Sequence, residues 1–417
     1  MARENLWLPY RQAQTAPAPQ VATRTEGARI ILEDGRSLVD GISSWWTACH
    51  GYNHPVIAAA VSAQLAQMPH VMLGGLVHEQ ACQLGGRLAA ALPGELEHVF
   101  FSESGSVAVE VGMKIAVQYW LNRGVSGRTR FLSFRHGYHG DTFAAMSVCD
   151  PEEGMHRLFG ELVAGQLIVD LPRNSTELTE FDKTLERHRD ELAGVILEPL
   201  VQAAGGMKFH SPEMLAAIAE TVSKHGVLLL LDEIATGFGR TGSLFACEQA
   251  GVTPDVIMLS KALTGGTLPL AATVASERVH SVFLSDTYEH ALMHGPTFAG
   301  NALACAAANA SLTLFETEPR LEQVAAIEER LTEGLAPCSG LAHVADVRVK
   351  GAIGVVQLDR VPDLDALRQA FLDEHVWIRP FHDVVYLMPP FVISEDELET
   401  LMRAVCRVVE RWSRAPS

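Results

Sequence analysis

Residues 227–233 read Val-Leu-Leu-Leu-Leu-Asp-Glu, and residues 255–261 read Asp-Val-Ile-Met-Leu-Ser-Lys. Each stretch is apolar at successive positions, which is typical of a strand that is buried on both faces of a parallel sheet. Each stretch also ends on side chains that carry charge in water. Because ligands of open α/β sheets bind beyond the carboxyl ends of parallel strands, we expect Asp232 and Lys261 to meet at one edge of the sheet.

The rest of the first 320 residues follows the same alternation of apolar runs and helical patterns. We predict further strands at residues 98–101, 130–134 and 194–198, and helices at residues 106–121 and 212–225. Strands that alternate with helices predict an α/β fold, in which helices cover both faces of a large, doubly wound and mostly parallel sheet.

The pattern changes near residue 321. A helical pattern at residues 321–335 precedes short strand candidates and a closing helix at residues 395–412, which indicates a smaller α+β domain. The strand candidates lie around residues 344–349, 353–358, 376–379 and 385–387. We therefore expect a large ligand-binding domain at residues 50–320 and a C-terminal small domain at residues 321–417, which residues 1–49 join as an N-terminal segment.

The composition favours a cytoplasmic enzyme. The 417 residues carry a formal net charge of −18, which disfavours nucleic acid and anionic membranes as partners. No run approaches the roughly 18 apolar residues that span a bilayer, and the first twenty residues lack the apolar core of a secretion signal. The seven cysteines are scattered and form no C-x-x-C pair, so we interpret them as reduced thiols.

Two loops after predicted strands are suited to a phosphorylated aromatic ligand. Residues 102–106, Ser-Glu-Ser-Gly-Ser, precede a long helix, and small residues at a helix N-terminus expose N–H groups that bind phosphate. A simple N-cap is the alternative interpretation. In residues 135–141, Tyr138 could lie flat on an aromatic ring. His136 and His139 are three residues apart, but no cluster of cysteines or carboxylates completes a ligand set, so we predict no metal.

Asp232 and Lys261 are the two residues that best indicate the chemistry of the site. A carboxylate at a buried strand end requires a cationic or hydrogen-bonding partner, and a protonated pyridine nitrogen is one such partner. A lysine in this position is either a surface residue just past the strand or a nucleophile stored as an imine with an aldehyde. Together with the phosphate loop and Tyr138, these residues supply contacts to the phosphate, ring face, ring nitrogen and aldehyde of pyridoxal phosphate (PLP).

A glycine-rich segment suggests an alternative function, that of a nicotinamide-dependent oxidoreductase. Residues 237–242 match the pattern G-x-G-x-x-G. In dinucleotide-binding folds this motif turns directly off a strand, whereas residues 232–236 here separate the glycines from the predicted strand. We therefore reject this alternative, which bleaching of a yellow protein by an added amine would also exclude.

Longer motifs resemble those of the class III aminotransferases, a family of fold type I PLP enzymes, over almost the whole chain. The Asp-Glu and Ser-Lys motifs are typical of the family. The Ser-Ser-Trp-Trp and Trp-Ile-Arg-Pro motifs resemble those of one activity, the transfer of an amino group from S-adenosylmethionine to 8-amino-7-oxononanoate in biotin biosynthesis. Two departures, Glu103 for Asp and Ala203 for Gly, remove no chemical group. The segments are residues 40–46 (DGISSWW), 50–55 (HGYNHP), 104–110 (SGSVAVE), 137–142 (GYHGDT), 232–242 (DEIATGFGRTG), 260–266 (SKALTGG), 294–298 (HGPTF) and 377–380 (WIRP).

The resemblance implies roles for individual residues. Lys261 would hold PLP covalently and carry the proton, Asp232 would pair with the pyridine nitrogen, and Tyr138 would cover the ring. The phosphate would be bound by Gly105 and Ser106, together with Pro296 and Thr297 from the other subunit of a homodimer. Arg379 would bind the carboxylate of 8-amino-7-oxononanoate, and Arg240 and Asp141 would order the site. The residues framing this substrate would include Tyr10, Trp45, Trp46, Gly295 and Arg379.

Two amino donors fit the sequence. Many class III relatives that accept glutamate carry a second glutamate shortly after a Glu-Pro strand end, where it switches off an arginine. Residues 198–206, Glu-Pro-Leu-Val-Gln-Ala-Ala-Gly-Gly, contain no such acid. This favours S-adenosylmethionine, with lysine as the alternative donor. The alternative activity is that of another class III enzyme, an ω-amino-acid transaminase, which should lack the paired tryptophan motifs.

Overall fold

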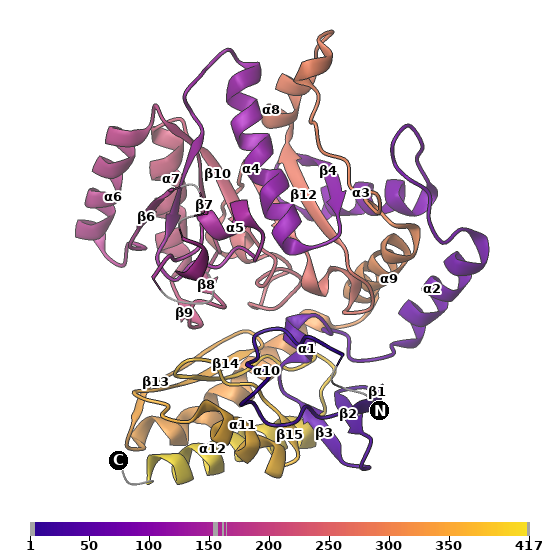
Figure 1. Cartoon of the computed structure of the whole chain (residues 1–417), viewed down its shortest axis with the longest axis vertical. Helices are drawn as coiled ribbons and strands as arrows, with labels where there is room; N and C mark the ends of the chain where they lie inside the picture. Colours follow the sequence, from indigo (N-terminus) through magenta and orange to yellow (C-terminus); the bar gives the residue numbers. More distant parts are fainter. Residues whose placement is uncertain (1–4, 153–156, 161, 164, 415–417) are drawn as a thin grey trace.

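The computed structural model describes residues 5–152, 157–160, 162–163 and 165–414. They form two parts, of which the upper one in Figure 1 is built on a seven-stranded sheet and the lower one on two smaller sheets. The strand order in the large sheet is β4-β12-β11-β10-β7-β5-β6. The bounds are β4 (Leu96–Ser102), β5 (Arg130–Phe134), β6 (Leu167–Val169), β7 (Leu192–Leu197), β10 (Leu228–Asp232), β11 (Val256–Leu259) and β12 (Ala271–Ser276).

Parallel pairing brings the ends of β10 and β11 to one edge of the large sheet. Asp232 of β10 is opposite Met258 of β11, and β7, β5 and β6 continue the parallel arrangement. Asp232 and Lys261 therefore lie at the same edge, where parallel sheets bind ligands. The predicted α/β fold with a large, doubly wound and mostly parallel sheet is confirmed.

The strand β12 departs from the parallel arrangement, because it pairs antiparallel with both β11 and β4. Its sequence, Ala-Ala-Thr-Val-Ala-Ser, was absent from the predicted strands because alanine favours helices and gives no strand pattern. All six residues are buried. Small side chains allow a helix to lie close above the strand, and the Thr273 hydroxyl donates a hydrogen bond to the Ala108 carbonyl oxygen at 2.8 Å.

Helices cover both faces of the large sheet. The helix α4 (Gly105–Asn122) shares one core cluster with Leu228 and Leu230, whereas Leu229 and Leu231 belong to the cluster on the other face. Alternate residues of β10 thus enter two cores, which explains why the whole strand is apolar. The other helices of this part are α2 (Pro55–Gln67), α3 (Glu79–Ala91), α5 (Phe143–Ser147), α6 (Ser175–His188), α7 (Pro212–Lys224), α8 (Glu277–His280) and α9 (Ala302–Thr317).

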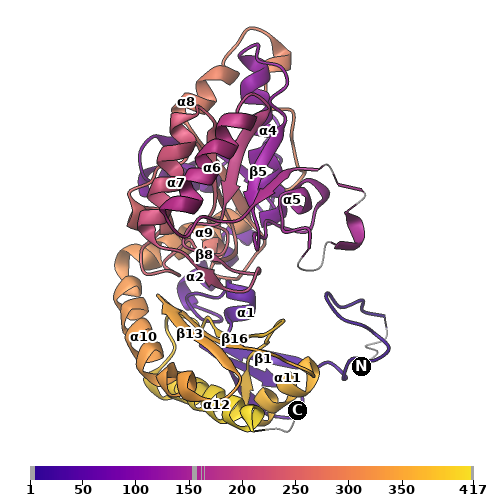
Figure 2. The ribbon, with the colours of Figure 1, turned by 90° about the vertical axis from the view of Figure 1, so that its left-hand side faces the viewer.

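The smaller part joins both ends of the chain. Val39 pairs in parallel with Val376, so the N-terminal strands and a strand near the C-terminus form one sheet. Figure 2 shows α10 and α12 along its outer side. The four-stranded sheet contains β1 (Ala22–Glu26), β2 (Arg29–Leu32), β3 (Ser37–Asp40) and β15 (Val376–Trp377), and the three-stranded sheet contains β13 (Val344–Lys350), β14 (Ile353–Leu358) and β16 (Val384–Leu387). The helices are α10 (Arg320–Leu335), α11 (Leu364–Asp373) and α12 (Glu395–Ser413).

Two short elements lie where the parts meet, α1 (Ser43–Trp46) and the two-stranded sheet of β8 (Val201–Gln202) and β9 (Lys208–Phe209). None of the described helices has the length and apolar character that crossing a membrane requires. All seven cysteines are free thiols, as predicted.

Candidate active site

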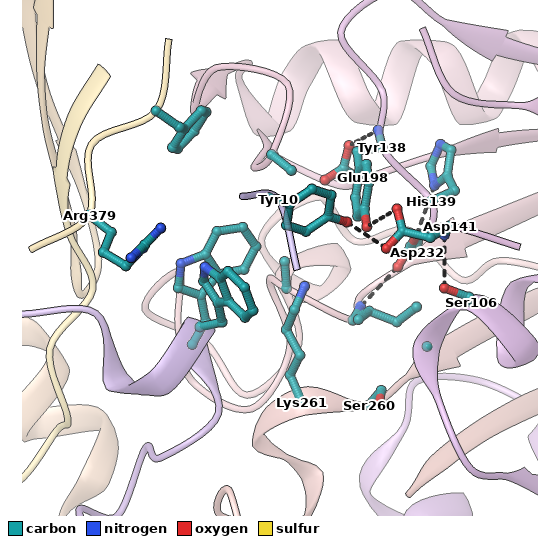
Figure 3. A pocket seen from close by; sticks show the side chains of 18 of the residues that line it. Tyr10, Ser106, Tyr138, His139, Asp141, Glu198, Asp232, Ser260, Lys261 and Arg379 are labelled. Carbon is teal, nitrogen blue, oxygen red and sulfur yellow. Dashed lines mark hydrogen bonds and ion pairs between the residues drawn. The ribbon is translucent and has the colours of Figure 1, made fainter. Parts of the chain in front are cut away.

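A cavity of about 370 Å³ opens at the edge of the large sheet where β10 and β11 end (Figure 3). Its walls come from both parts of the molecule and from the N-terminal segment. The structure brings together most of the side chains that the sequence singled out. Those that line the cavity are Tyr10, Trp45, Trp46, Gly105, Ser106, Tyr138, Asp232, Lys261 and Arg379.

Three residues that were predicted to contact the cofactor or the substrate do not line this cavity, namely Gly295, Pro296 and Thr297. They lie in an irregular segment between η5 (Tyr288–His290) and α9, and Thr297 is exposed. Within one chain they therefore contribute nothing to the site, and their predicted role depends on a second subunit.

Lys261 follows the end of β11 by two residues and lines the cavity. Its backbone φ of 41° is in the left-handed region, which is costly for a residue with a side chain. Its Nζ lies 4.3 Å from the centre of the Trp46 ring. Burial lowers the pKa of the amine, while the carboxylates of Asp232, Glu198 and Asp141 oppose this shift. An amine with a lowered pKa is more often neutral, which is the form that acts as a nucleophile.

Asp232 is held by two hydrogen bonds at the end of β10. Its Oδ2 lies 2.8 Å from Nδ1 of His139, and its Oδ1 accepts the N–H of Ile234 at 3.0 Å. Both side chains of the Asp232–His139 pair are almost fully buried. Burial disfavours the charged imidazole, but the hydrogen bond and charge of Asp232 outweigh it, so the pKa of His139 is raised. The pair places a carboxylate that is hydrogen-bonded to His139 at the cavity wall.

His139 had been considered only as a metal ligand together with His136. The structure separates the two rings, because Nε2 of His136 lies 2.8 Å from Nζ of Lys208, whereas His139 faces Asp232. The position of His139 directly after Tyr138 was the only sequence signal for its place in the site.

Asp141 joins the N-terminal segment to the cavity wall. Its two carboxylate oxygens accept hydrogen bonds from the hydroxyls of Tyr10, at 2.6 Å, and Tyr138, at 2.9 Å. Its N–H donates to the Ser106 hydroxyl at 3.0 Å. Burial raises the pKa of Tyr10 to about 12 and raises that of Tyr138 further, so both hydroxyls remain donors. The neighbouring Gly140 permits this approach, because a Cβ there would lie 2.3 Å from Oγ of Ser106.

Glu198, at the end of β7, is a buried acid that the site prediction lacked. Its carboxylate accepts the N–H groups of Tyr138 at 3.1 Å and Ala203 at 2.9 Å. Burial raises its pKa to about 7. By binding the backbone of Tyr138, Glu198 fixes the loop that carries the predicted ring-stacking residue. A single acid after a strand gives no sequence signal of its hydrogen bond to Tyr138, which is 60 residues away in the chain.

The tryptophan pair sits on a left-handed turn. Residues 43–46 all have positive φ, between 47° and 72°, and successive left-handed residues are strained in an L-chain by about 1–2 kcal/mol each. Asp40 stabilises this turn, since its carboxylate accepts the N–H groups of Ile42 at 2.9 Å and Ser44 at 3.1 Å and the hydroxyl of Tyr52 at 2.6 Å. Such local strain is common at functional sites.

Arg379 reaches the cavity from the smaller part. Its guanidinium lies 5.7 Å from the centre of the Trp377 ring. Among the described residues it forms no ion pair with a carboxylate, whereas its neighbour Arg368 is bonded to Asp365 at 3.1 Å. Burial and the charge of Arg368 lower the pKa of Arg379. A half-buried guanidinium without a carboxylate partner is suited to an anionic ligand.

Arg240, from the large part of the chain, is hydrogen-bonded to the backbone of the smaller part. One of its nitrogens donates to the carbonyl oxygens of Ala352 at 3.1 Å and Pro389 at 2.8 Å, and the guanidinium lies 4.5 Å from the centre of the Phe391 ring. The side chain is fully buried and does not line the cavity. It therefore orders the cavity walls rather than contacting a ligand.

The residues of the cavity fit PLP. The N-terminus of the 18-residue helix α4 opens into the cavity at Gly105 and Ser106, where it suits a phosphate. A Cβ on Gly105 would lie 3.0 Å from Ile234, so glycine keeps this approach open. The buried Asp232 suits a protonated ring nitrogen, and Lys261 supplies the amine for the aldehyde. The cavity thus offers one suitable group for each reactive part of the cofactor.

The fold and the cavity define a PLP-dependent enzyme of fold type I. Residues 10–409 match the Aminotransferase class-III family, so the chain belongs to the class III aminotransferases, as the motifs predicted. The protein is therefore a PLP-dependent transaminase.

Its similarity to known proteins extends over nearly the whole chain. It is 45% identical to the adenosylmethionine-8-amino-7-oxononanoate aminotransferase of Mycobacterium leprae (strain TN), over 97% of this chain and 94% of the relative. It is 44% identical to the protein of the same name from Corynebacterium glutamicum, over 97% of both chains.

Two solved structures are also similar to this chain over nearly its whole length. The structure of adenosylmethionine-8-amino-7-oxononanoate aminotransferase from Methanocaldococcus jannaschii superposes with a TM-score of 0.92 at 33% identity and covers 98% of this chain and 97% of that one. An amine transaminase from an uncultivated Pseudomonas species, in its PLP-bound form, superposes with a TM-score of 0.90 at 31% identity over 99% of both chains.

Proposed function

We propose that the protein transfers an amino group from S-adenosylmethionine to 8-amino-7-oxononanoate, which yields 7,8-diaminononanoate for biotin biosynthesis. One observation supports this above all: Arg379, which is half-buried and forms no ion pair with a carboxylate of the described residues, lies across the cavity from Asp232 and Lys261 (Figure 3). Trp45 and Trp46 line the same cavity. A long acceptor with a carboxylate at one end and a ketone near the other matches this arrangement. The names of the two relatives that are 44–45% identical support the same substrate pair.

The acceptor would lie along the aromatic wall. Trp45 and Trp46 would pack on its alkyl chain, Tyr10 would close the cavity above it, and the guanidinium of Arg379 would bind its carboxylate. The Tyr10 ring meets the Trp45 ring edge-on at 6.2 Å, so the N-terminal segment and α1 would cover the substrate together. This enclosure would exclude water from the reacting carbon.

The chemistry divides between the cofactor and the chain. When bound, PLP supplies an aldehyde that takes up the donor amine and a ring that withdraws electrons from the reacting carbon. Nζ of Lys261 would first hold the cofactor and, once released, would move the proton at the reacting carbon. Asp232, with Nδ1–H of His139 behind it, would keep the ring nitrogen protonated. Gly105 and Ser106 would bind the phosphate, and Tyr138, held by Asp141 and Glu198, would lie over the ring.

S-adenosylmethionine and lysine should be compared directly as donors. Purified enzyme with PLP and 8-amino-7-oxononanoate is supplied with each donor at equal concentration, and the diamine is measured. We expect product from S-adenosylmethionine. Product from lysine alone would overturn the proposed donor but not the acceptor. Product from neither donor, with a simple ω-amino acid active instead, would overturn the proposed function.

We further propose that the enzyme is a cytoplasmic homodimer with active sites shared between subunits. The position of residues 295–297 outside their own chain's cavity supports this arrangement, in which Pro296 and Thr297 would reach the partner's phosphate site and Gly295 its substrate. Sedimentation should give a dimer at the enzyme concentrations used in assays. A fully active monomer would contradict the proposal.

A further inference from the structure

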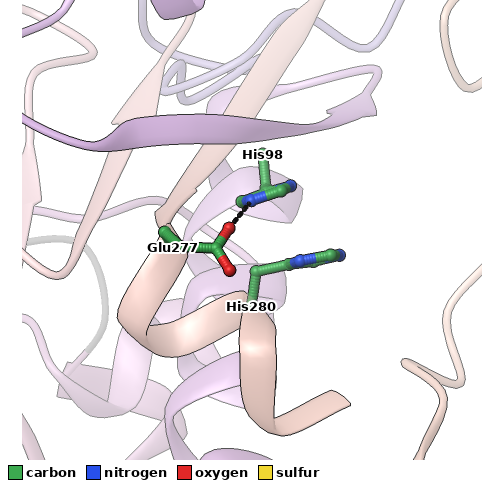
Figure 4. A group of neighbouring side chains, drawn as sticks. All are labelled: His98, Glu277 and His280. Carbon is green, nitrogen blue, oxygen red and sulfur yellow. Dashed lines mark hydrogen bonds and ion pairs between the residues drawn. The ribbon is translucent and has the colours of Figure 1, made fainter. Parts of the chain in front are cut away.

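Two histidines and a glutamate face one another at the edge of the large sheet opposite to the cavity. Because β12 runs antiparallel to β4, Ser276 at the end of β12 pairs with Leu96 at the start of β4. The one-turn helix α8 follows β12 directly. This connection brings Glu277 and His280 beside His98 of β4, as Figure 4 shows.

The three side chains are close enough to share an ion. One ligand atom from each lies within 4.8 Å of the others. Nε2 of His98 is 2.6 Å from the Glu277 carboxylate, and the rings of His98 and His280 are stacked with their centres 3.6 Å apart. Nδ1 of His280 is buried and has no hydrogen-bond partner among the described residues.

The side chains of this cluster are suited to a cation. An imidazole nitrogen that carries no proton offers a lone pair to a metal ion, and Nδ1 of His280 has no other partner among the described residues. The Glu277 carboxylate adds negative charge. The backbone N–H of Glu277 donates to the carbonyl oxygen of Glu95 at 3.0 Å, which joins the start of α8 to the residue before β4.

We propose that His98, Glu277 and His280 bind a Zn²⁺ ion, with solvent completing the coordination. Two imidazoles and one carboxylate are ligands that Zn²⁺ accepts, whereas Mg²⁺ and Ca²⁺ prefer oxygen ligands alone. Bonds of about 2.0–2.2 Å in a tetrahedral site place the ligand atoms roughly 3.3–3.6 Å from one another. Nε2 of His98 and the Glu277 oxygen, now 2.6 Å apart, would therefore separate, and any ligand atoms that are farther apart than this would approach. The rings would rotate out of their stack, and the ion would replace the His98–Glu277 hydrogen bond.

The ion would have a structural role. It would link β4 to α8, which is a single turn and too short to be stable as an isolated helix. Since the cluster lies at the opposite edge of the sheet from Asp232 and Lys261, its ligands do not contact the cavity. Zn²⁺ should therefore stabilise the fold without taking part in amino transfer.

The test measures zinc binding to the PLP-loaded enzyme. Protein treated with a chelator and dialysed is titrated with ZnCl₂ in competition with a chromogenic chelator. We expect one Zn²⁺ per chain for the wild type. Loss of second-shell partners alone typically weakens metal binding 10- to 100-fold, so His280→Ala and Glu277→Gln should weaken it at least about tenfold. Zn²⁺ should raise the Tm of the wild type but not of these variants.

A matched control is His343→Ala, which removes a surface histidine paired with the single carboxylate of Asp359 at 2.9 Å. This variant should bind zinc like the wild type. Unchanged transaminase activity in all variants would show that they fold. Co²⁺ in place of zinc should give the visible absorption of a site with nitrogen ligands, and His280→Ala should abolish it. Equal zinc affinity in the wild type and both ligand variants, or no binding at all, would overturn the proposal.

Discussion

Replacement of Arg379 by alanine tests how the acceptor is recognised. The guanidinium lines the cavity, is half-buried and forms no ion pair with a carboxylate of the described residues. A hydrogen bond between charged groups in such a position contributes about 1.5–3 kcal/mol. This range corresponds to roughly 10- to 150-fold in an equilibrium constant. We expect Arg379→Ala to raise KM for 8-amino-7-oxononanoate by this factor and to change kcat little, because the carboxylate is remote from the reacting ketone.

The assay compares the acceptor with its primary amide. The wild type should prefer the carboxylate, whereas Arg379→Ala should lose this preference, and Arg379→Lys should keep part of it because lysine retains the charge but not the planar fork. Arg407→Ala is the control, since that arginine pairs with Glu374 on the surface of the smaller part. Equal losses with acid and amide, or no loss with either, would refute a carboxylate contact at Arg379.

Four further predictions concern the cofactor, the subunits and the fold. Lys261→Ala should abolish transamination and the visible absorbance of bound PLP without unfolding the protein, and borohydride labelling of a different lysine would contradict its role. Mixing that variant with Thr297→Ala should restore part of the activity if sites are shared, and no recovery after subunit exchange would argue against sharing. Asp40→Asn should raise the acceptor KM while PLP affinity stays unchanged, because it weakens the turn that carries the tryptophans; an unchanged KM would show that the turn holds without the carboxylate. Burial and the charge of Arg320 lower the pKa of His50 to about 3, so between this value and about 6.5 the unfolded chain binds one more proton. As pH falls through this window, the free energy of unfolding measured in urea should decrease by about 1.4 kcal/mol per pH unit more for the wild type than for His50→Gln. An equal decrease in both proteins would contradict the lowered pKa of His50.

The sequence predicted the strands that are buried on both faces, because their apolar runs leave a local pattern. The strand at 130–134 has the predicted bounds. β11 begins one residue later than the predicted 255–259, and β10 is shifted by one residue at both ends from the predicted 227–231. The sequence did not predict β12, because its residues are small so that α4 can pack closely against the strand. This packing depends on the tertiary structure and leaves no strand pattern in the sequence. The parallel register then brought Asp232 and Lys261 to one edge, as the order of strands and motifs had indicated.

The site was predictable where a residue ends a strand or belongs to a motif, and not where its role depends on a distant partner. His139 acts through Asp232, and Glu198 through the backbone of Tyr138. Asp40 was quoted only as part of a motif, although its three hydrogen bonds hold the strained turn of Trp45 and Trp46. Hydrogen bonds between residues far apart in the chain leave no periodic signal in the sequence.

By itself the sequence determined the alternating strands and helices, the acid and the lysine at adjacent strand ends, and the kind of cofactor that these groups suit. These features are local, since burial sets the spacing of apolar residues and the strand end sets where a polar side chain emerges. The family resemblance implied that Tyr10 and Arg379, from opposite ends of the chain, frame one substrate, but only the tertiary structure places both side chains at the same cavity. Their meeting depends on β3 pairing with β15 and on the packing of the smaller part against the large sheet, which no short stretch of sequence encodes.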